Sequence, residues 1–426
     1  MKNFKAGDYL KIILKDEEIK GIYIPSSNKD VLTLKLSSGY NLGVNKKDIR
    51  KIELIKKEKK MVIKNKIKLR KDLPIISILH TGGTLASKVD YKIGGVFSSF
   101  TPEDVLALVP ELGEISNFNS RLISNMWSDD LRFEHFSIIA KEIEKEIKKG
   151  VKGIIIGMGT DNLAVAAAAL SFIIKETPVP IILIGAQRSS DRGSSDAAMN
   201  LVCASKFIVN TDFSDVAICM HDYMSDDYCS ILPACKTRKL HSSRRDAFKA
   251  VNDIPIAKVS YKGKDIVFNK DYKKGGKLVI KPNMENKTGF LKIHINMFAS
   301  EFSAFKGYKG LVIEGTGLGN TPLDVLDRYT KEHAKIRNAL ENLVRSGTVI
   351  VMTTNCLFGK VNMNVYSKGV DLIKIGVIPG EDMLPETAFV KLSWLLGNYK
   401  KEMVRELVKR NLRGEINERI TAEFSL

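Results

Sequence analysis

The sequence predicts an α/β protein with two doubly wound, mainly parallel sheets, preceded by a small N-terminal β-barrel. Three observations support this fold class. Short β-rich runs separated by turn residues fill residues 4–54, strand and helix patterns alternate after Pro74, and the alternation resumes from Gly289. Strands that alternate with helices predict a mainly parallel sheet with helices on both faces.

Length and composition indicate a globular protein of more than one domain. The chain has 426 residues, of which 44% are hydrophobic and 27% are charged, so two or three domains are expected. No apolar run is long enough to span a bilayer, and the first residues have no apolar core of the signal-peptide type. We therefore expect a cytoplasmic protein without membrane contact.

Residues 1–55 are expected to form the small barrel. Runs at 9–14, 19–24, 31–36 and 40–44 mostly alternate or are β-rich, and Pro, Ser, Asn and Gly separate them. Four or five strands at this spacing are typical of a small β-barrel. Such barrels bind nucleic acids or protein partners, and they also serve as structural appendages.

Residues 56–72 are expected to be a basic linker. The first 72 residues hold 20 Lys and Arg against 9 Asp and Glu, so +11 of the net charge of +18 lies there. A basic module is the electrostatic footprint of nucleic-acid binding. A lysine-rich, solvated surface has the same composition, and both interpretations remain open.

The alternating patterns divide the remaining chain into two α/β domains at 73–252 and 288–426, joined by a connection at 253–287. In the first domain we expect a strand from Ile75, buried strands at 153–157 and 180–185, and helices at 133–149, 163–174 and 194–206. In the second we expect strands at 290–295, 310–315 and 348–352, and a helix from about 323 to 346.

Two stretches place a threonine just after a buried strand: Thr81-Gly-Gly-Thr84, and Gly159-Thr160-Asp161. Glycines let the backbone turn sharply and expose its N–H groups, and open α/β sheets bind ligands at the carboxyl ends of their strands. Each stretch alone is explained by a glycine turn or a helix cap. Two in one sheet favour a site, because a hydroxyl nucleophile needs an activating partner. Tyr91 and Lys239 are the candidate partners.

The five cysteines form no CxxC pair. His221, Cys229 and Cys235 lie near one another in sequence, but their spacings fit no usual zinc pattern. We therefore expect no metal site.

The motifs, taken in order, resemble the L-asparaginase family. Thr81-Gly-Gly-Thr84-Leu-Ala, Tyr91-Lys-Ile-Gly, Gly159-Thr160-Asp161 and Lys239 carry the resemblance, which covers roughly residues 73–410. The N-terminal module and five further stretches are similar to one branch, the D subunits of archaeal glutamyl-tRNA(Gln) amidotransferases. These stretches are 185–201, 241–248, 361–367, 376–392 and 411–417.

This resemblance implies an asparaginase-like fold and a role for each matching residue. Thr84 is implied as the nucleophile that attacks the side-chain amide carbon, with Tyr91 beside it to help remove its proton. Thr160, Lys239 and Asp161 are implied as a second triad, in which the ammonium favours threonine deprotonation or activates water. The implied substrate-binding residues are Ser128, Asp129, Gly83 and Gly159, which offer a hydroxyl, a carboxylate and backbone N–H groups.

The resemblance also implies partners. The chain would hydrolyse glutamine and pass ammonia to an E subunit, which amidates Glu-tRNA(Gln), and it would form a homodimer within a D2E2 complex that binds tRNA(Gln). No P-loop and no GxGxxG after a strand occur in the sequence. No cofactor is therefore expected in this chain, and ATP and Mg²⁺ are expected at the E subunit.

Three residues depart from the pattern of the family, and two alternative functions remain open. Met158 stands where the family usually has histidine, Asn162 where it usually has threonine, and Asn355 where the branch usually has glutamine. The main alternative is a free-standing asparaginase or glutaminase. Another is an inactive tRNA-binding scaffold.

Overall fold

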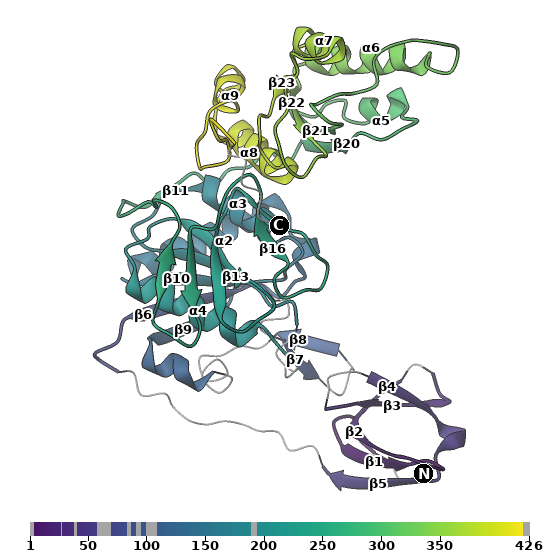
Figure 1. The fold of residues 1–426 in the computed structure, drawn as a ribbon, viewed down its shortest axis with the longest axis vertical. Coiled ribbons are helices and arrows are strands. Elements are labelled where there is room, and N and C mark those ends of the chain that lie inside the picture. The colour runs from purple at the N-terminus through teal and green to yellow at the C-terminus, as the bar shows by residue number, and fades with distance from the viewer. Residues whose placement is uncertain are drawn as a thin grey trace.

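The structure is a computed structural model that describes residues 4–26, 28–37, 41–57, 70–82, 87–90, 95–98, 109–188 and 194–420. For residues 87–90 and 95–98, which form strands β7 (Ser87–Asp90) and β8 (Gly95–Ser98), it describes the backbone alone. Figure 1 shows an N-terminal sheet, a central α/β body and a C-terminal α/β domain, in that order along the long axis.

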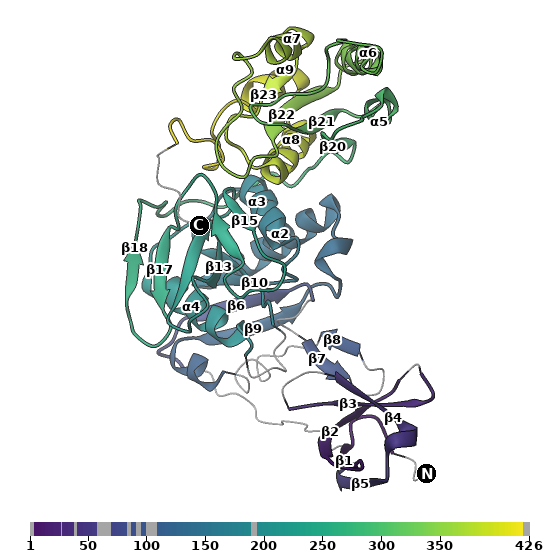
Figure 2. The same ribbon diagram turned by 45° about the vertical axis from the view of Figure 1, so that its right-hand side comes forward.

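The N-terminal sheet is antiparallel, and its strands are ordered β4-β3-β2-β1-β5. Alternate side chains of these strands, among them Leu10, Ile12, Leu32 and Leu34, are buried in one small core. This period-two pattern is the signal that predicted the strands, and Figure 2 shows them as one curved sheet at the N-terminal end of the molecule. The strands are β1 (Tyr9–Ile13), β2 (Glu18–Ile24), β3 (Val31–Lys35), β4 (Asn41–Asn45) and β5 (Lys51–Lys56).

The central body is built on an eight-stranded sheet with the order β18-β17-β14-β13-β12-β10-β6-β9. Its parallel strands are β6 (Ile75–His80), β9 (Asn117–Leu122), β10 (Gly153–Gly157), β12 (Ile181–Ile184) and β13 (Val216–His221). The chain runs from β6 to β9 on one side and then crosses to β10 on the other. The strand order therefore reverses between β6 and β10, which is where doubly wound sheets bind ligands.

Helices cover both faces of this sheet. Ile154 and Ile156 of β10 pack in the core that contains α2 (Phe133–Lys148) and α3 (Leu163–Ile173). Ile155, which points to the opposite face, packs in the core that contains α4 (Ala197–Asn210). Successive side chains of a strand point to opposite faces, so the fully apolar strands are explained by this two-sided burial.

Residues 253–287, expected as a connection, also contribute to the sheets. The antiparallel strands β14 (Tyr228–Pro233), β17 (Ala257–Ser260) and β18 (Ile266–Phe268) continue the central sheet beyond β13. Strands β17 and β18 have only four and three residues, too few for a periodic pattern to be recognised in the sequence. The short strands β11 (Ile174–Glu176) and β19 (Val279–Ile280) pair separately, as do β15 (Thr237–Lys239) and β16 (Phe248–Ala250).

The C-terminal domain has a parallel sheet of β20 (Thr288–Lys292), β21 (Gly310–Gly315), β22 (Val349–Thr354) and β23 (Ile378–Pro379). Its helix α6 spans Glu332–Arg345, so the prediction of a helix from about residue 323 began too early. A turn precedes α6, in which the Thr330 hydroxyl accepts from the backbone N–H of Asp327 (2.9 Å) and the Asp327 carboxylate accepts from that of Thr330 (2.9 Å). Such side-chain bonds compete with helix formation. The remaining helices are α5 (Ala299–Ser303), α7 (Ser367–Ile375), α8 (Pro385–Asn398) and α9 (Lys401–Leu407).

The two α/β domains share a packed interface. Trp394 of α8 stacks on Phe172 of α3 with ring centroids 5.7 Å apart, and the apolar core of α2 and α3 continues into α8 and β22. Lys236, just before β15, forms a fully buried ion pair of 2.6 Å with Asp382 of the C-terminal domain. A bilayer-spanning helix, which needs about 20 mostly apolar residues, is absent from the described residues.

Candidate functional site

The ends of β6, β9 and β10 are joined by backbone hydrogen bonds at the point where the strand order reverses. The N–H of Thr81 donates to Gly157 at 3.0 Å, and the N–H of Met126 donates to Thr81 at 2.9 Å. Gly82 has a φ of +107°, and a Cβ there would lie 2.7 Å from the Met126 carbonyl oxygen. Only glycine fits this turn without strain, so the Thr81-Gly82 stretch is fixed beside β10.

Lys239 contacts both other members of the second triad expected from the sequence, Thr160 and Asp161. Its Nζ donates to Thr160 Oγ1 at 2.9 Å and to Asp161 Oδ1 at 2.7 Å. Thr160 and Asp161 follow β10, and Lys239 ends β15, almost 80 residues later in the chain. The lysine side chain is only 14% exposed, whereas that of Asp161 is 68% exposed. The ammonium therefore lies largely buried, between the buried Thr160 and the exposed Asp161.

Ser128 lies directly against the loop that carries Thr160. Ser128 begins the 3₁₀ turn Ser128–Asp130 and is buried, and its neighbour Asp129 is exposed. A Cβ on Gly159 would lie 3.0 Å from Ser128 Oγ and 3.1 Å from Ser128 Cβ. Glycine at position 159 thus lets the two loops approach more closely than a side chain would allow.

Asn162 ties the same two loops together. Its backbone N–H donates to Ser128 Oγ at 3.3 Å, and its side-chain Nδ2 donates to the Ser128 carbonyl at 3.0 Å. The sequence had marked Asn162 only as a departure from the family pattern. Its role as a brace was missed, because Ser128 lies 34 residues earlier in the chain. Met158, the other departure near this loop, is fully buried in the apolar core.

Three of the residues predicted from the sequence, Thr84, Tyr91 and Gly83, lie outside the described residues. The structure brings the other six together around the ends of β6 and β10: Thr160, Asp161, Lys239, Ser128, Asp129 and Gly159.

This arrangement can polarise a hydroxyl group. An ammonium within hydrogen-bonding distance of Thr160 stabilises the alkoxide form of the hydroxyl, and the Asp161 carboxylate orients the ammonium. Ser128 Oγ and Asp129 Oδ1 lie 3.5 Å apart at the same edge. Together they offer a donor for a carboxylate and an acceptor for an ammonium, which are the two charged groups of a free amino acid.

The histidine and cysteines considered for a metal do not form a cluster. His221 pairs with Cys229 across β13 and β14, but Cys235 lies in a different apolar core. Within the described ranges no three His, Cys, Asp or Glu side chains gather as a metal site requires. Burial raises the pKa of the Cys229 thiol well above its ordinary value and that of Cys235 to about 12, so both stay protonated at neutral pH.

The strand that carries Lys239 is braced by the C-terminal domain, a second feature that sequence reasoning missed. Lys236 is bonded to Asp382, Arg238 pairs with Glu386 at 2.9 Å, and the Thr387 hydroxyl donates to the Cys235 carbonyl at 2.9 Å. An apolar pattern gives no sign of such long-range pairs. The one signal available in the sequence was Lys236, a lysine that follows the buried strand β14.

Three protein families match the chain, and together they cover most of its length. Residues 75–274 match "Asparaginase, N-terminal", residues 288–408 match "Glutaminase/Asparaginase C-terminal domain", and residues 4–55 match "GatD N-terminal domain". The three matches coincide with the three largest sheets of the described residues.

Two relatives are similar in sequence over nearly the whole chain. The D subunit of the glutamyl-tRNA(Gln) amidotransferase of Pyrococcus furiosus is 42% identical, over 97% of this chain and 95% of that protein. The corresponding D subunit of Methanococcus maripaludis is also 42% identical, over 98% and 99%.

Solved structures are similar over the two α/β domains. The thermostable L-asparaginase from Thermococcus kodakarensis has a TM-score of 0.70 and 27% identity, covering 81% of this chain and all of that one. L-asparaginase I from Vibrio cholerae has a TM-score of 0.67 and 26% identity, covering 81% and 99%. The part that these enzymes leave unmatched corresponds in extent to the N-terminal module and linker.

Proposed function

The chain belongs to the family of glutamyl-tRNA(Gln) amidotransferase D subunits, and on this premise we propose that it is the glutamine-hydrolysing subunit of such an enzyme. The observation that carries the proposal is the Lys239 ammonium, bonded to both Thr160 and Asp161 at the end of β10. An intact triad favours an amidohydrolase over an inactive scaffold. The N-terminal module matched at residues 4–55 favours the amidotransferase subunit over a free-standing asparaginase.

The proposed reaction has two steps. Thr84, two residues after Gly82 in the chain, attacks the side-chain amide carbon of glutamine; a C–O bond forms, the C–N bond breaks, and ammonia leaves with the threonine proton. Water then hydrolyses the ester to glutamate. In this proposal Tyr91 helps remove the Thr84 proton, and Thr160, Lys239 and Asp161 assist proton transfer or activate the water. Backbone N–H groups of Gly83 and Gly159 bind the substrate and the oxyanion.

Ser128 and Asp129 are proposed to hold the α-carboxylate and α-ammonium of glutamine. Two of their features support this role. The Ser128 loop is held by Asn162 through two hydrogen bonds, and the Asp129 side chain is exposed beside it. A rigid loop positions the reacting amide with little loss of conformational entropy.

The ammonia is proposed to pass to an E subunit that amidates Glu-tRNA(Gln) with ATP and Mg²⁺, in a cytoplasmic D2E2 complex that binds tRNA(Gln).

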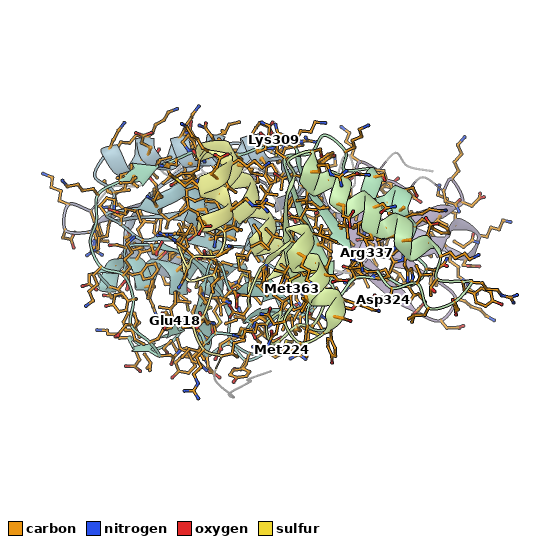
Figure 3. All side chains as sticks on the ribbon, turned by 90° about the horizontal axis from the view of Figure 1, so that it is seen from above. Met224, Lys309, Asp324, Arg337, Met363 and Glu418 are labelled. Atoms are coloured by element: carbon orange, nitrogen blue, oxygen red, sulfur yellow. The ribbon has the colours of Figure 1, made fainter. Side chains whose placement is uncertain are left out.

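An exposed C-terminal apolar surface supports pairing with a second copy of the chain. Ile295, Leu326 and Tyr329 are 93%, 79% and 76% exposed. Their loops are held together, since Ala299 donates to Glu332 at 3.1 Å and Lys368 contacts Asp324 at 3.5 Å; Asp324 is labelled in Figure 3. We also propose the domain division 1–55, 56–72, 73–252, 253–287 and 288–426, in which strands β17 and β18 of the segment 253–287 extend the central sheet.

A glutaminase assay tests the proposal. The purified chain is expected to release ammonia from glutamine, faster when the E subunit and Glu-tRNA(Gln) are added. Thr84→Ala should lower kcat by orders of magnitude with the fold intact, as for other covalent nucleophiles. Turnover close to wild type in a folded Thr84→Ala variant would contradict the nucleophile, and asparagine hydrolysis unaffected by the partner would favour a free-standing asparaginase.

A further inference from the structure

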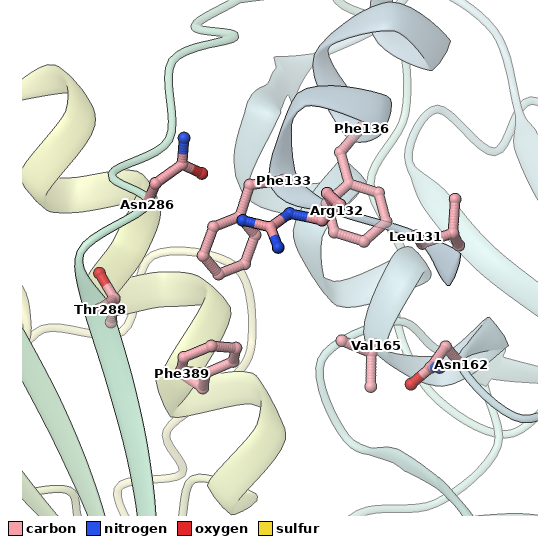
Figure 4. Close-up of a pocket in the computed structure, with 9 residues that line it drawn as sticks. All are labelled: Leu131, Arg132, Phe133, Phe136, Asn162, Val165, Asn286, Thr288 and Phe389. Carbon is pink, nitrogen blue, oxygen red and sulfur yellow. The ribbon is translucent and has the colours of Figure 1, made fainter. Parts of the chain in front are cut away.

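A pocket of about 320 Å³ lies between the two α/β domains, beside the candidate site. The start of α2 and the start of α3 form one wall, and β20 and α8 form the other (Figure 4). The volume lies in the range of small-molecule sites, which begins at about 300 Å³. Its lining residues are Leu131, Arg132, Phe133, Phe136, Asn162, Val165, Asn286, Thr288 and Phe389.

The interior of the pocket is apolar and aromatic. Phe133 and Phe389 face each other from the two domains with ring centroids 5.3 Å apart, while Phe136 and Val165 supply further apolar surface (Figure 4). Aromatic walls of this kind favour a flat or branched apolar group, because they bury its surface and pack against its faces.

The mouth of the pocket carries both signs of charge. In Figure 4 the Arg132 guanidinium extends past Phe133 on the side of Asn286. Among the described residues, no acceptor lies within hydrogen-bonding distance of that guanidinium. Asn286 Nδ2 donates to Glu134 Oε1 at 2.6 Å, which brings the Glu134 carboxylate to the same mouth.

We propose that this pocket binds a free α-amino acid with an apolar, preferably aromatic, side chain. Arg132 binds its carboxylate through paired N–H donors, Glu134 accepts from its ammonium, and the side chain enters between Phe133, Phe136 and Phe389. A purely apolar molecule would leave both charges unused, and a simple anion would be repelled by Glu134. The zwitterion matches the guanidinium, the carboxylate and the aromatic interior at once.

The bound amino acid also acts on the candidate site, a step that rests on the proposed glutaminase function. Asn162 lines the pocket and donates to the Ser128 carbonyl, and Arg132 follows the Ser128–Asp130 turn after one residue. A ligand held by Arg132 therefore restrains the loop on which glutamine is proposed to bind. Occupancy is expected to lower the KM for glutamine and to leave kcat nearly unchanged.

Calorimetric titration of the full chain with L-phenylalanine tests the binding site directly. Saturable 1:1 binding is expected, with at least about tenfold weaker binding of L-phenylalaninamide, which lacks the carboxylate, and of 3-phenylpropionate, which lacks the ammonium. Arg132→Met should abolish the preference for phenylalanine over its amide. Glu134→Gln should abolish the preference over phenylpropionate. Val165→Phe should fill the pocket and remove binding.

Matched controls separate the site from general surface effects. Arg345→Met and Glu144→Gln remove the same charges from an exposed and a half-buried position away from the pocket, and they should leave all three affinities unchanged. No saturable binding to the wild-type chain, or equal binding of the three probes, overturns the proposal, as does full binding to a folded Val165→Phe variant. Because the titration needs no turnover, a failed glutaminase assay and a failed binding assay remain distinguishable.

Discussion

Lys239 is the residue on which the candidate site depends, because its single ammonium serves two acceptors from one loop. Thr160 and Asp161 lie 2.9 and 2.7 Å from its Nζ. A lysine held this way has one orientation, so it can act on the threonine only while the aspartate keeps it in place. The three groups are therefore expected to act as a unit.

The first prediction tests this coupling. Thr160→Val keeps the shape and removes the hydroxyl, and Lys239→Met keeps the stem and removes the charge. Each is expected to lower kcat/KM by about a hundredfold or more, and the double variant should be little worse than either single variant. Steady-state kinetics measures the three losses. If the losses of the two single variants simply add in the double variant, the groups work separately. Lys258→Met is the control for charge removal, because it removes a lysine that pairs with Asp222 at 2.7 Å.

At the scale of single elements, α2 is anchored to the sheet by a buried carboxylate. Glu146 accepts from Ser77 of β6 at 2.7 Å, from Arg121 of β9 at 3.0 Å and from Lys149 at 2.8 Å. Burial alone would raise the pKa of this carboxyl, but the bonds from Lys149, Ser77 and Arg121 outweigh it and hold the pKa below its ordinary value of 4.5. The folded state therefore binds this proton more weakly than the unfolded chain.

The second prediction follows from the sign of that shift. A lowered carboxyl pKa contributes stability above the ordinary pKa, and the contribution is lost as pH falls through the folded value. Glu146→Gln should therefore be less stable at pH 7 and lose less stability than wild type between pH 5 and pH 3. Urea midpoints across this range measure the effect. The control is Glu144→Gln, on the same helix in an ion pair with Lys148, which should lose as much stability between pH 5 and pH 3 as the wild type. If Glu146→Gln also loses as much as the wild type, the carboxyl of Glu146 does not have the lowered pKa.

The short strand β15 depends on the C-terminal domain, which is the basis of a third prediction. Lys236→Met leaves the Asp382 carboxylate buried without its counter-ion, a loss of about 3–5 kcal/mol. Adding Asp382→Asn should recover part of it, because the amide oxygen still accepts from Asn417, whose N–H lies 2.9 Å from Asp382 Oδ1. Denaturant unfolding measures both. Lys148→Met breaks an exposed pair and should cost under 1 kcal/mol; equal small losses in all variants would contradict the brace.

The helices and strands could be predicted from the sequence more reliably than the order in which the strands lie in the sheets. Fully apolar runs such as Ile154–Ile156 predicted two-sided burial, and β10 lies between β6 and β12 with helices on both faces. The order of the strands, with β9 outside β6, depends on crossovers that periodicity does not encode. Strands β17 and β18 were missed because they have only four and three residues, too few to show a period.

The candidate site shows the same limit. Thr160 and Asp161 could be picked out from their place after a buried strand. Lys239 could be picked out only as a candidate partner, because on its own it has the pattern of a surface lysine. Asn162 and the pair of Lys236 with Asp382, which are 146 residues apart, could not be inferred from spacing. Their roles rest on contacts that only the folded chain brings together.

Over the whole molecule the charge is uneven, with +11 of the net +18 in residues 1–72. Lysines that contact tRNA phosphates would release counterions and make binding steeply salt-dependent. Single-stranded RNA is also held by aromatic stacking platforms, but Phe4 and Tyr23 of the module pack against its own core. This favours a module that packs on the catalytic body or on a partner subunit, with its lysines solvated.

Deletion of residues 1–60 distinguishes the two roles. Every proposed catalytic group lies after residue 72, so glutamine hydrolysis should be retained in either case. If the module only packs, the deleted chain in its assembled complex should bind tRNA with the same slope of log K against log salt as the full chain. Sedimentation first establishes that the complex has formed, and binding is then measured at several salt concentrations. A flatter slope after deletion would show that lysines of this segment contact phosphates, since each lost contact reduces the slope by about 0.7 to 0.9.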